Sequence, residues 1–188
     1  MTLLRIFATL VFSVLMSSSL HAADDYSKTT NIFKQSPAVQ PFFKAAYGYA
    51  VFPTIGKGGI GIGGAHGKGQ TYRGGNVSGS TKMTQVTIGL QFGGQAYSQI
   101  IFFKDKRAYD DFTSGNFEFG AQASAVAITA GATAQAGTTG AGGGATGGGT
   151  AGAQDASYYK GMAVFTHAKG GLMYEAAIGG QKFSFKPL

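Results

Sequence analysis

Side chains that could carry acid–base or metal chemistry are few and scattered. The chain of 188 residues has 3 histidines, 8 acidic residues and no cysteine. Thiol catalysis, disulfides and a lipidated amino-terminal cysteine are therefore excluded. A metal site needs carboxylates near a histidine, and the acidic residue nearest to His66 or His167 is Glu175, eight positions after His167. The sequence thus predicts no catalytic residue, no metal site and no cofactor, and both histidines are interpreted as surface or half-buried residues.

Basic residues are the better candidates for binding. The formal net charge is +7, and no acidic residue occurs between Asp25 and Asp105. A segment with one sign of charge attracts polyanions such as anionic lipid headgroups, although unevenly distributed solubilising charge is the simpler alternative. Nucleic acid is not expected, because no nucleic-acid-binding module is recognisable. The candidate lipid-binding residues lie at predicted turns and strand ends: Lys57, Lys68, Tyr72, Arg73 and Lys82.

These candidates surround a glycine-rich stretch, residues 47–75. Glycines alternate there with Ile60 and Ile62, which would leave one strand face bare for another backbone or a flat surface to approach. Residues 56–61 match the pattern G-x-G-x-x-G, but a dinucleotide site requires a helix after the turn, and the alternation here predicts extended chain. Glycine turns can also present backbone N–H groups to phosphate oxygens.

The first residues, 1–22, have the pattern of a secretory signal peptide. Arg5 precedes an apolar run of residues 6–16, and small residues lead to a predicted cleavage after Ala22. The run is too short for a membrane anchor, which needs ~20 residues. We therefore expect an exported protein in the periplasm or at the outer membrane, with a single domain over residues 23–188.

Periodicity predicts a mostly β domain with short helices. Residues 24–46 read as two helical pieces, the second starting at Ser36 and Pro37. A strand from Tyr49 is expected to stop at Pro53, and residues 60–65 form a glycine-rich strand. Residues 82–93 alternate strictly, with Val86 on the apolar face, and 96–103 form a strand buried on both faces. Turns are expected at 67–69 or 74–75 and a turn or bulge at 93–94.

The second half of the chain is less regular. Asp105 is predicted to cap a short helix that ends near Gly115, and residues 117–136 favour strands over a helix. Residues 137–153 contain only Gly, Ala and Thr and predict a flexible loop. Strands follow at 158–166 and 171–178. The predicted fold class is α+β: a curved antiparallel sheet or partly closed barrel, with one or two short helices packed on it.

Four stretches of the chain resemble the SYLF domain family, which includes yeast actin-patch proteins and secreted bacterial relatives. They are residues 48–64 (GYAVFPTIGKGGIGIGG), 89–103 (GLQFGGQAYSQIIFF), 119–127 (FGAQASAVA) and 161–180 (GMAVFTHAKGGLMYEAAIGG). The resemblance implies a non-enzymatic module that binds lipid, with Lys57 as a matching contact residue.

Eukaryotic SYLF domains bind phosphoinositides and other anionic phospholipids, and some bind actin. An exported protein would meet neither phosphoinositides nor actin, so the expected partner is an anionic phospholipid or membrane surface. Two alternatives stay open. One is a structural or scaffolding protein that binds a partner by strand addition. The other is an integral outer-membrane barrel, against which the non-alternating residues 100–103 and the ending Lys186-Pro187-Leu188 argue.

Overall fold

The computed structural model describes residues 25–120, 123, 125–128, 158–170 and 178–188. The predicted signal peptide (1–22), the predicted loop (137–153) and most of the predicted strand 171–178 lie outside these residues. The elements are a helix over residues 25–35, α2 (Gln40–Ala45), β1 (Gly48–Arg73), β2 (Asn76–Phe103), α3 (Lys106–Thr113), β3 (Phe117–Glu118), β4 (Val126–Ile128), β5 (Met162–Gly170) and β6 (Lys182–Pro187).

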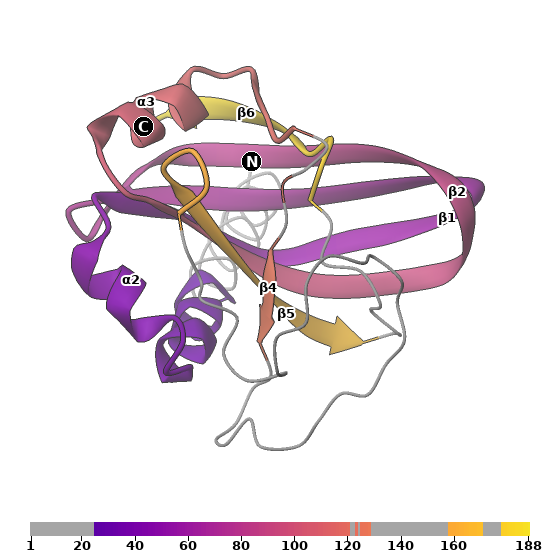
Figure 1. The fold of residues 1–188 in the computed structure, drawn as a ribbon, viewed down its shortest axis with the longest axis horizontal. Helices are drawn as coiled ribbons and strands as arrows, with labels where there is room; N and C mark the ends of the chain where they lie inside the picture. The colour runs from indigo at the N-terminus through magenta and orange to yellow at the C-terminus, as the bar shows by residue number, and fades with distance from the viewer. Residues whose placement is uncertain (1–24, 121–122, 124, 129–157, 171–177) are drawn as a thin grey trace, which may run out of the picture.

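One long hairpin, β1 and β2, dominates the fold (Figure 1). The strands join at Gly74 and Gly75, whose positive φ angles of 58° and 82° suit a tight turn that favours glycine. A straight strand of 26 residues would reach about 85 Å, about twice the ~40 Å diameter of a domain of this size. The hairpin therefore bends back on itself. Its turn half comprises residues 64–73 and 76–86, and its open half comprises 48–58 and 94–103.

Glycines let the two halves of β1 come together. A Cβ on Gly69 would lie 2.7 Å from Cδ1 of Phe52 and 2.8 Å from the carbonyl oxygen of Val51. A Cβ on Gly67 would lie 2.6 Å from Cγ1 of Ile55. The bare strand face expected from the sequence therefore exists, and what approaches it is an earlier part of the same strand.

β1 and β2 run through three places where the sequence analysis allowed a break. Pro53 does not end its strand: it lies where the register shifts between Phe52 and Ile55, and β1 pairs only with β2, so the missing N–H removes no necessary ladder bond. Residues 67–69 are likewise paired strand rather than a turn. Residues 93–94, predicted as a turn or bulge, are also paired, and a register shift lies next to them, between the pairs Ile60–Phe92 and Ile62–Ile88. The turn alternative at Gly74 and Gly75 is confirmed.

Shorter strands extend each half of the hairpin. β6 pairs with Gly79–Thr84 of the turn half and carries β3 at its edge. β5 pairs with Ala96–Phe103 of the open half and carries β4, which runs parallel to it. The concave side between the halves holds the main core, in which the rings of Phe52 and Phe183 lie 5.6 Å apart.

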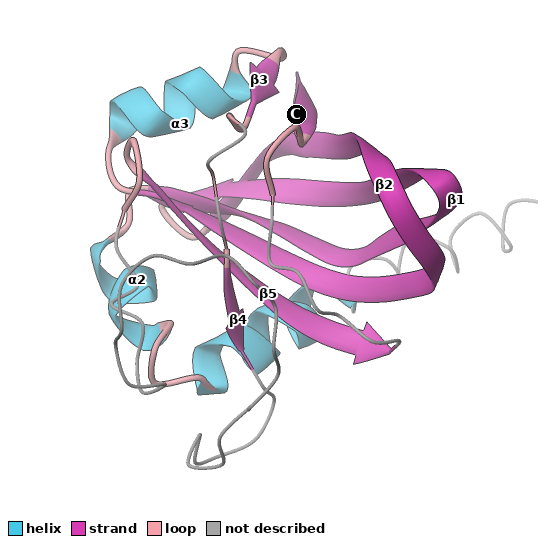
Figure 2. Cartoon of the chain, turned by 45° about the vertical axis from the view of Figure 1, so that its right-hand side comes forward, coloured by secondary structure: helices cyan, strands magenta, loops and turns pink. Residues whose placement is uncertain are grey.

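The helices α2 and α3 pack on the sheet (Figure 2). Phe42 of α2 packs on Phe102 and Phe165, on the outer face of the open half, as expected for a short helix packed on the sheet. The helix α2 begins at Gln40, later than predicted, because a turn occupies residues 37–39, where the carbonyl oxygen of Ser36 accepts from the N–H groups of Val39 and Gln40.

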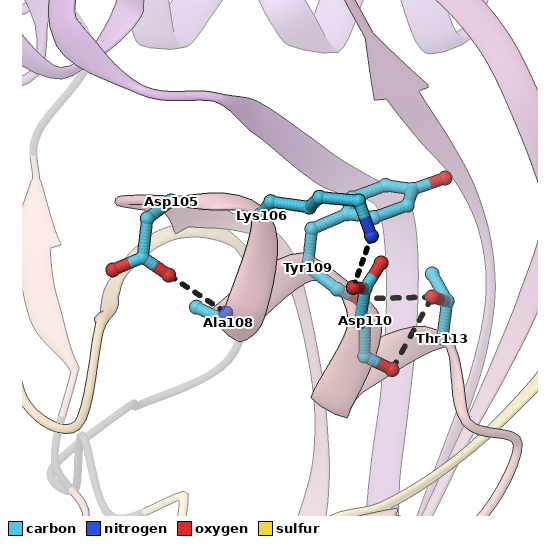
Figure 3. A network of polar contacts seen from close by, with 6 residues as sticks. All are labelled: Asp105, Lys106, Ala108, Tyr109, Asp110 and Thr113. Atoms are coloured by element: carbon cyan, nitrogen blue, oxygen red, sulfur yellow. Dashed lines mark hydrogen bonds and ion pairs between the residues drawn. The ribbon is translucent and has the colours of Figure 1, made fainter.

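The predicted cap of α3 is confirmed, since Oδ1 of Asp105 accepts from the N–H of Ala108 at 2.9 Å (Figure 3). The exposed side of α3 carries the ion pair Lys106–Asp110, and the hydroxyl of Thr113 donates to the carbonyl oxygen of Tyr109. Its buried side, with Phe112, joins the main core. The chain is thus an α+β domain built on a strongly curved, mostly antiparallel sheet, as predicted.

Candidate functional site

The outer face of the turn half gathers exposed lysines from three strands. Side chains alternate along β1, so Gly67 and Gly69 face the core while Lys68 faces outward. Lys68 lies directly opposite Lys82, and Lys82 is paired in turn with Ser184 of β6. On either side of that row, Lys182 lies opposite Thr84 and Lys186 opposite Ser80. We call Lys68, Lys82, Lys182 and Lys186 the basic face.

The spacing within the basic face follows from sheet geometry. Directly opposed residues have Cβ atoms about 5 Å apart, and diagonal neighbours are about 7–8 Å apart. Lys182 and Lys186 are diagonal neighbours of Lys82, so the four ammonium groups can reach one area of the outer face. Hydroxyl groups of Ser80, Thr84 and Ser184 lie between them.

The positive charge of the basic face is balanced by few of the carboxylates that the structure describes. Two like charges directly opposite each other destabilise a sheet, as at Lys68 and Lys82. Among the described residues, one ion pair reaches the face, between Nζ of Lys182 and Oε2 of Glu118 at 3.5 Å, and both side chains are well exposed. An anion bound across the face would relieve this repulsion.

Sequence reasoning found half of the basic face and missed the other half. Lys68 and Lys82 were predicted, and the structure brings them together. Lys182 and Lys186 were not predicted, although Phe183 is buried and the alternation K-F-S-F-K indicates that both lysines point away from the core. Their pairing with a strand about 100 residues earlier carries no local sequence signal.

The other three predicted residues lie elsewhere. Lys57 is half-buried in the open half, opposite Gln95. Arg73 ends β1, and its guanidinium lies 5.7 Å from the ring centre of Tyr109 on α3. Neither belongs to the basic face, although both are close to its lysines in sequence.

Tyr72 is a packing residue rather than an exposed aromatic. Its ring stacks on Tyr49 at 4.8 Å, and its hydroxyl donates to Oε1 of Gln70 at 2.9 Å. Burial, with smaller contributions from Tyr49 and Tyr26, raises the pKa of Tyr72 to about 12. The side chain is half-buried and packs with the apolar cluster on the outer face of the open half; its role as a lipid contact stays a prediction.

A buried polar layer on the concave side is the second candidate for a site. Gln99 and Gln181 exchange amide hydrogen bonds of 3.0 and 3.3 Å, and the amide of Gln181 also donates to the hydroxyl of Tyr97 at 3.2 Å. Burial raises the pKa of Tyr97 to about 12, opposed by that bond. Because these groups satisfy one another, the layer is a structural feature of the core.

Histidines and carboxylates are not assembled for chemistry in the described part of the chain. No group of three or more His, Cys, Asp or Glu side chains there could hold a metal ion. His66 is exposed opposite Thr84, and His167 is half-buried, with its pKa lowered by burial and by Lys169. None of the helices in that part is long and apolar enough to cross a membrane.

Together these features define a curved β domain with a helical cover and one lysine-rich outer face. The sequence model of the family Ysc84, described as "Las17-binding protein actin regulator", matches residues 84–185, which is more than half of the chain. The chain belongs to this family, the SYLF family of lipid-binding and generally non-enzymatic domains, so the resemblance seen in the sequence is confirmed.

A bacterial relative is also similar to this chain. "Beta cell expansion factor A" from Aeromonas veronii is 27% identical over 161 residues, which cover 81% of this chain and 51% of the relative. The chain therefore spans about half the length of this curated relative.

Proposed function

We propose that the chain binds anionic phospholipid surfaces through the basic face and performs no chemical reaction. The observation that carries this proposal is the placement of four exposed lysines from β1, β2 and β6 at neighbouring positions on one face of the sheet, with one carboxylate at its edge. Membership of a lipid-binding family supports it. Actin binding is not part of the proposal.

The chemistry of the face favours a headgroup surface over a single small ligand. Its lysines are exposed and lie on a sheet surface rather than in a cleft. Each lysine near an anionic membrane contributes about 1 kcal/mol, and the effect decays within a Debye length. Four lysines would give weak, reversible and salt-sensitive attachment.

We further propose that this binding occurs outside the cytosol, in the periplasm or at the outer membrane, because residues 1–22 have a signal-peptide pattern. The amino-terminal sequence of the protein from an envelope fraction tests this part. A start at Ala23 is expected, and an uncleaved chain confined to the cytoplasm contradicts it.

Vesicle flotation tests the binding itself. The purified protein should float with vesicles of phosphatidylcholine that contain phosphatidylglycerol, and much less with phosphatidylcholine alone. Raising the salt from about 0.15 M to about 1 M shortens the Debye length from about 8 to about 3 Å, and should release most of the protein. Equal recovery on both vesicles, or binding that ignores salt, contradicts the proposal.

A further inference from the structure

The bend of the hairpin is an end of the molecule with its own composition. It lies where the pairing of β1 with β2 shifts in register: Ile60 is opposite Phe92, whereas Ile62 is opposite Ile88. Figure 1 shows β1 and β2 curving back at the end of the long axis away from α2 and α3. Among the residues that the structure describes, no helix lies beside the bend, which forms a protruding end of the sheet.

Two large apolar side chains are exposed next to the bend. The side chains of Ile62 and Val86 are 69% and 73% exposed. Val86 lies opposite Gly64, which has no side chain to cover it. Both residues follow the outward alternation of Lys68 and Lys82 along their strands. The outer face of the hairpin thus changes from basic to apolar as it approaches the bend.

Charged residues flank the bend but are absent from it. On β1, residues 58–65 carry no charge and lie between Lys57 and His66. On β2, residues 83–103 carry no charge and follow Lys82. An uncharged, apolar end flanked by lysines suits the boundary between headgroups and acyl chains, because lysine stems lie along apolar surface while the ammonium groups stay at phosphate level.

We infer that the β1–β2 bend inserts between the lipids of an anionic bilayer, with Ile62 and Val86 in the acyl region and Lys57, Lys68 and Lys82 at the phosphates around it. This inference rests on the proposed function and adds an orientation to it: the bend points into the membrane and α3 points away. The occupant must be a bilayer, because a soluble phosphate compound would use the lysines and leave the apolar pair in water.

A single tryptophan tests the insertion directly, because the chain contains none. Ile62→Trp places the reporter beside the bend. Tyr159→Trp is the matched control: Tyr159 is 50% exposed, and its turn lies beside α3, where Arg107 bonds the carbonyl oxygen of Lys160. On phosphatidylglycerol-containing vesicles with brominated acyl chains, the tryptophan at position 62 should shift to the blue and be quenched, while the tryptophan at 159 should do neither.

A second variant removes the apolar pair and leaves every lysine in place. Ile62→Ser combined with Val86→Ser should reduce vesicle binding at about 0.15 M salt, where the wild-type protein is expected to be bound, roughly tenfold. Val77→Ser, at an exposed site beside the hairpin turn, should leave binding unchanged. Insertion is refuted if the wild-type protein floats but the tryptophan at 62 is quenched no more than that at 159. It is also refuted if the wild-type protein floats and the serine pair changes nothing. In either case the proposed function stands. If the wild-type protein does not float, both fail.

Discussion

Neutralising the four lysines of the basic face is expected to weaken binding to anionic vesicles by roughly two to three orders of magnitude, from about 1 kcal/mol per lysine near a charged membrane. The reason is geometric as well as electrostatic, since Lys68 and Lys82 are directly opposed and both act on the same headgroups. The change should be made with glutamine, which keeps a polar side chain of similar length, and measured by vesicle flotation at low salt. The substituted positions are Lys68, Lys82, Lys182 and Lys186.

A control with the same net charge separates the face from bulk charge. Four exposed lysines outside the basic face are available, and two of them lie on the helices that cover the open half. If position matters, this variant should lose much less affinity, and the free energy of unfolding should not fall in either protein. Equal losses in the two variants would show that net charge alone attracts the protein. The control positions are Lys34, Lys44, Lys104 and Lys169.

Gly69→Ala is expected to lower the free energy of unfolding by about 3 kcal/mol, a large cost for one methyl group. The new Cβ would lie 2.7 Å from the Phe52 ring and 2.8 Å from the Val51 carbonyl oxygen. A backbone atom cannot move aside as a flexible side chain can, so the two halves of β1 would have to separate. The urea midpoint should fall by roughly 1.5 M.

Gly56→Ala is the matched control for this effect. Gly56 lies in the same strand, and a Cβ there meets nothing within 4 Å. Alanine at such a site usually changes stability by less than about 1 kcal/mol, in the stabilising direction. If both substitutions behave alike, close approach of the strand to itself is not what Gly69 provides.

The sequence predicted the extended segments better than their ends. Strict alternation identified residues 82–93, and the unbroken apolar run identified 96–103 as buried on both faces; the structure confirms both strands. Pro53 and Gly67 were read as stops because those residues usually interrupt strands. In this fold Pro53 lies at a bulge of a strand with one partner, and Gly67 lies against Ile55. Neither role can be seen without the tertiary packing.

Alternation alone also left open which face of a strand is the core. Val86 was placed on the apolar face of its strand, yet it is 73% exposed and the neighbouring Gln85 is buried. The amide of Gln85 donates to the carbonyl oxygen of Gly179 at 2.9 Å, which satisfies it inside the core. Because its amide is satisfied by a distant backbone carbonyl, Gln85 can face the core while the apolar Val86 faces outward, which is the opposite of what hydrophobicity alone predicts.

The candidate site was only partly predictable for a related reason. Lysines close in sequence were assumed to share one surface, but Lys57 lies opposite Gln95 in the open half and Lys68 lies opposite Lys82 in the turn half. Arg73 lies against Tyr109 of α3. The strand β6 then supplies Lys182 and Lys186 from the other end of the chain. Local charge density indicated the class of ligand, and the pairing of distant strands determined which residues form the face.

Lysine footprinting on vesicles tests the central claim most directly. The protein would be acetylated with and without vesicles of phosphatidylcholine and phosphatidylglycerol, and each lysine would be quantified by mass spectrometry. Protection of Lys68, Lys82, Lys182 and Lys186, with Lys34 and Lys44 still reactive, is the predicted result. Protection of Lys34 and Lys44 instead, or equal reactivity at all six positions in the vesicle-bound protein, would show that the basic face is not the surface that meets the membrane.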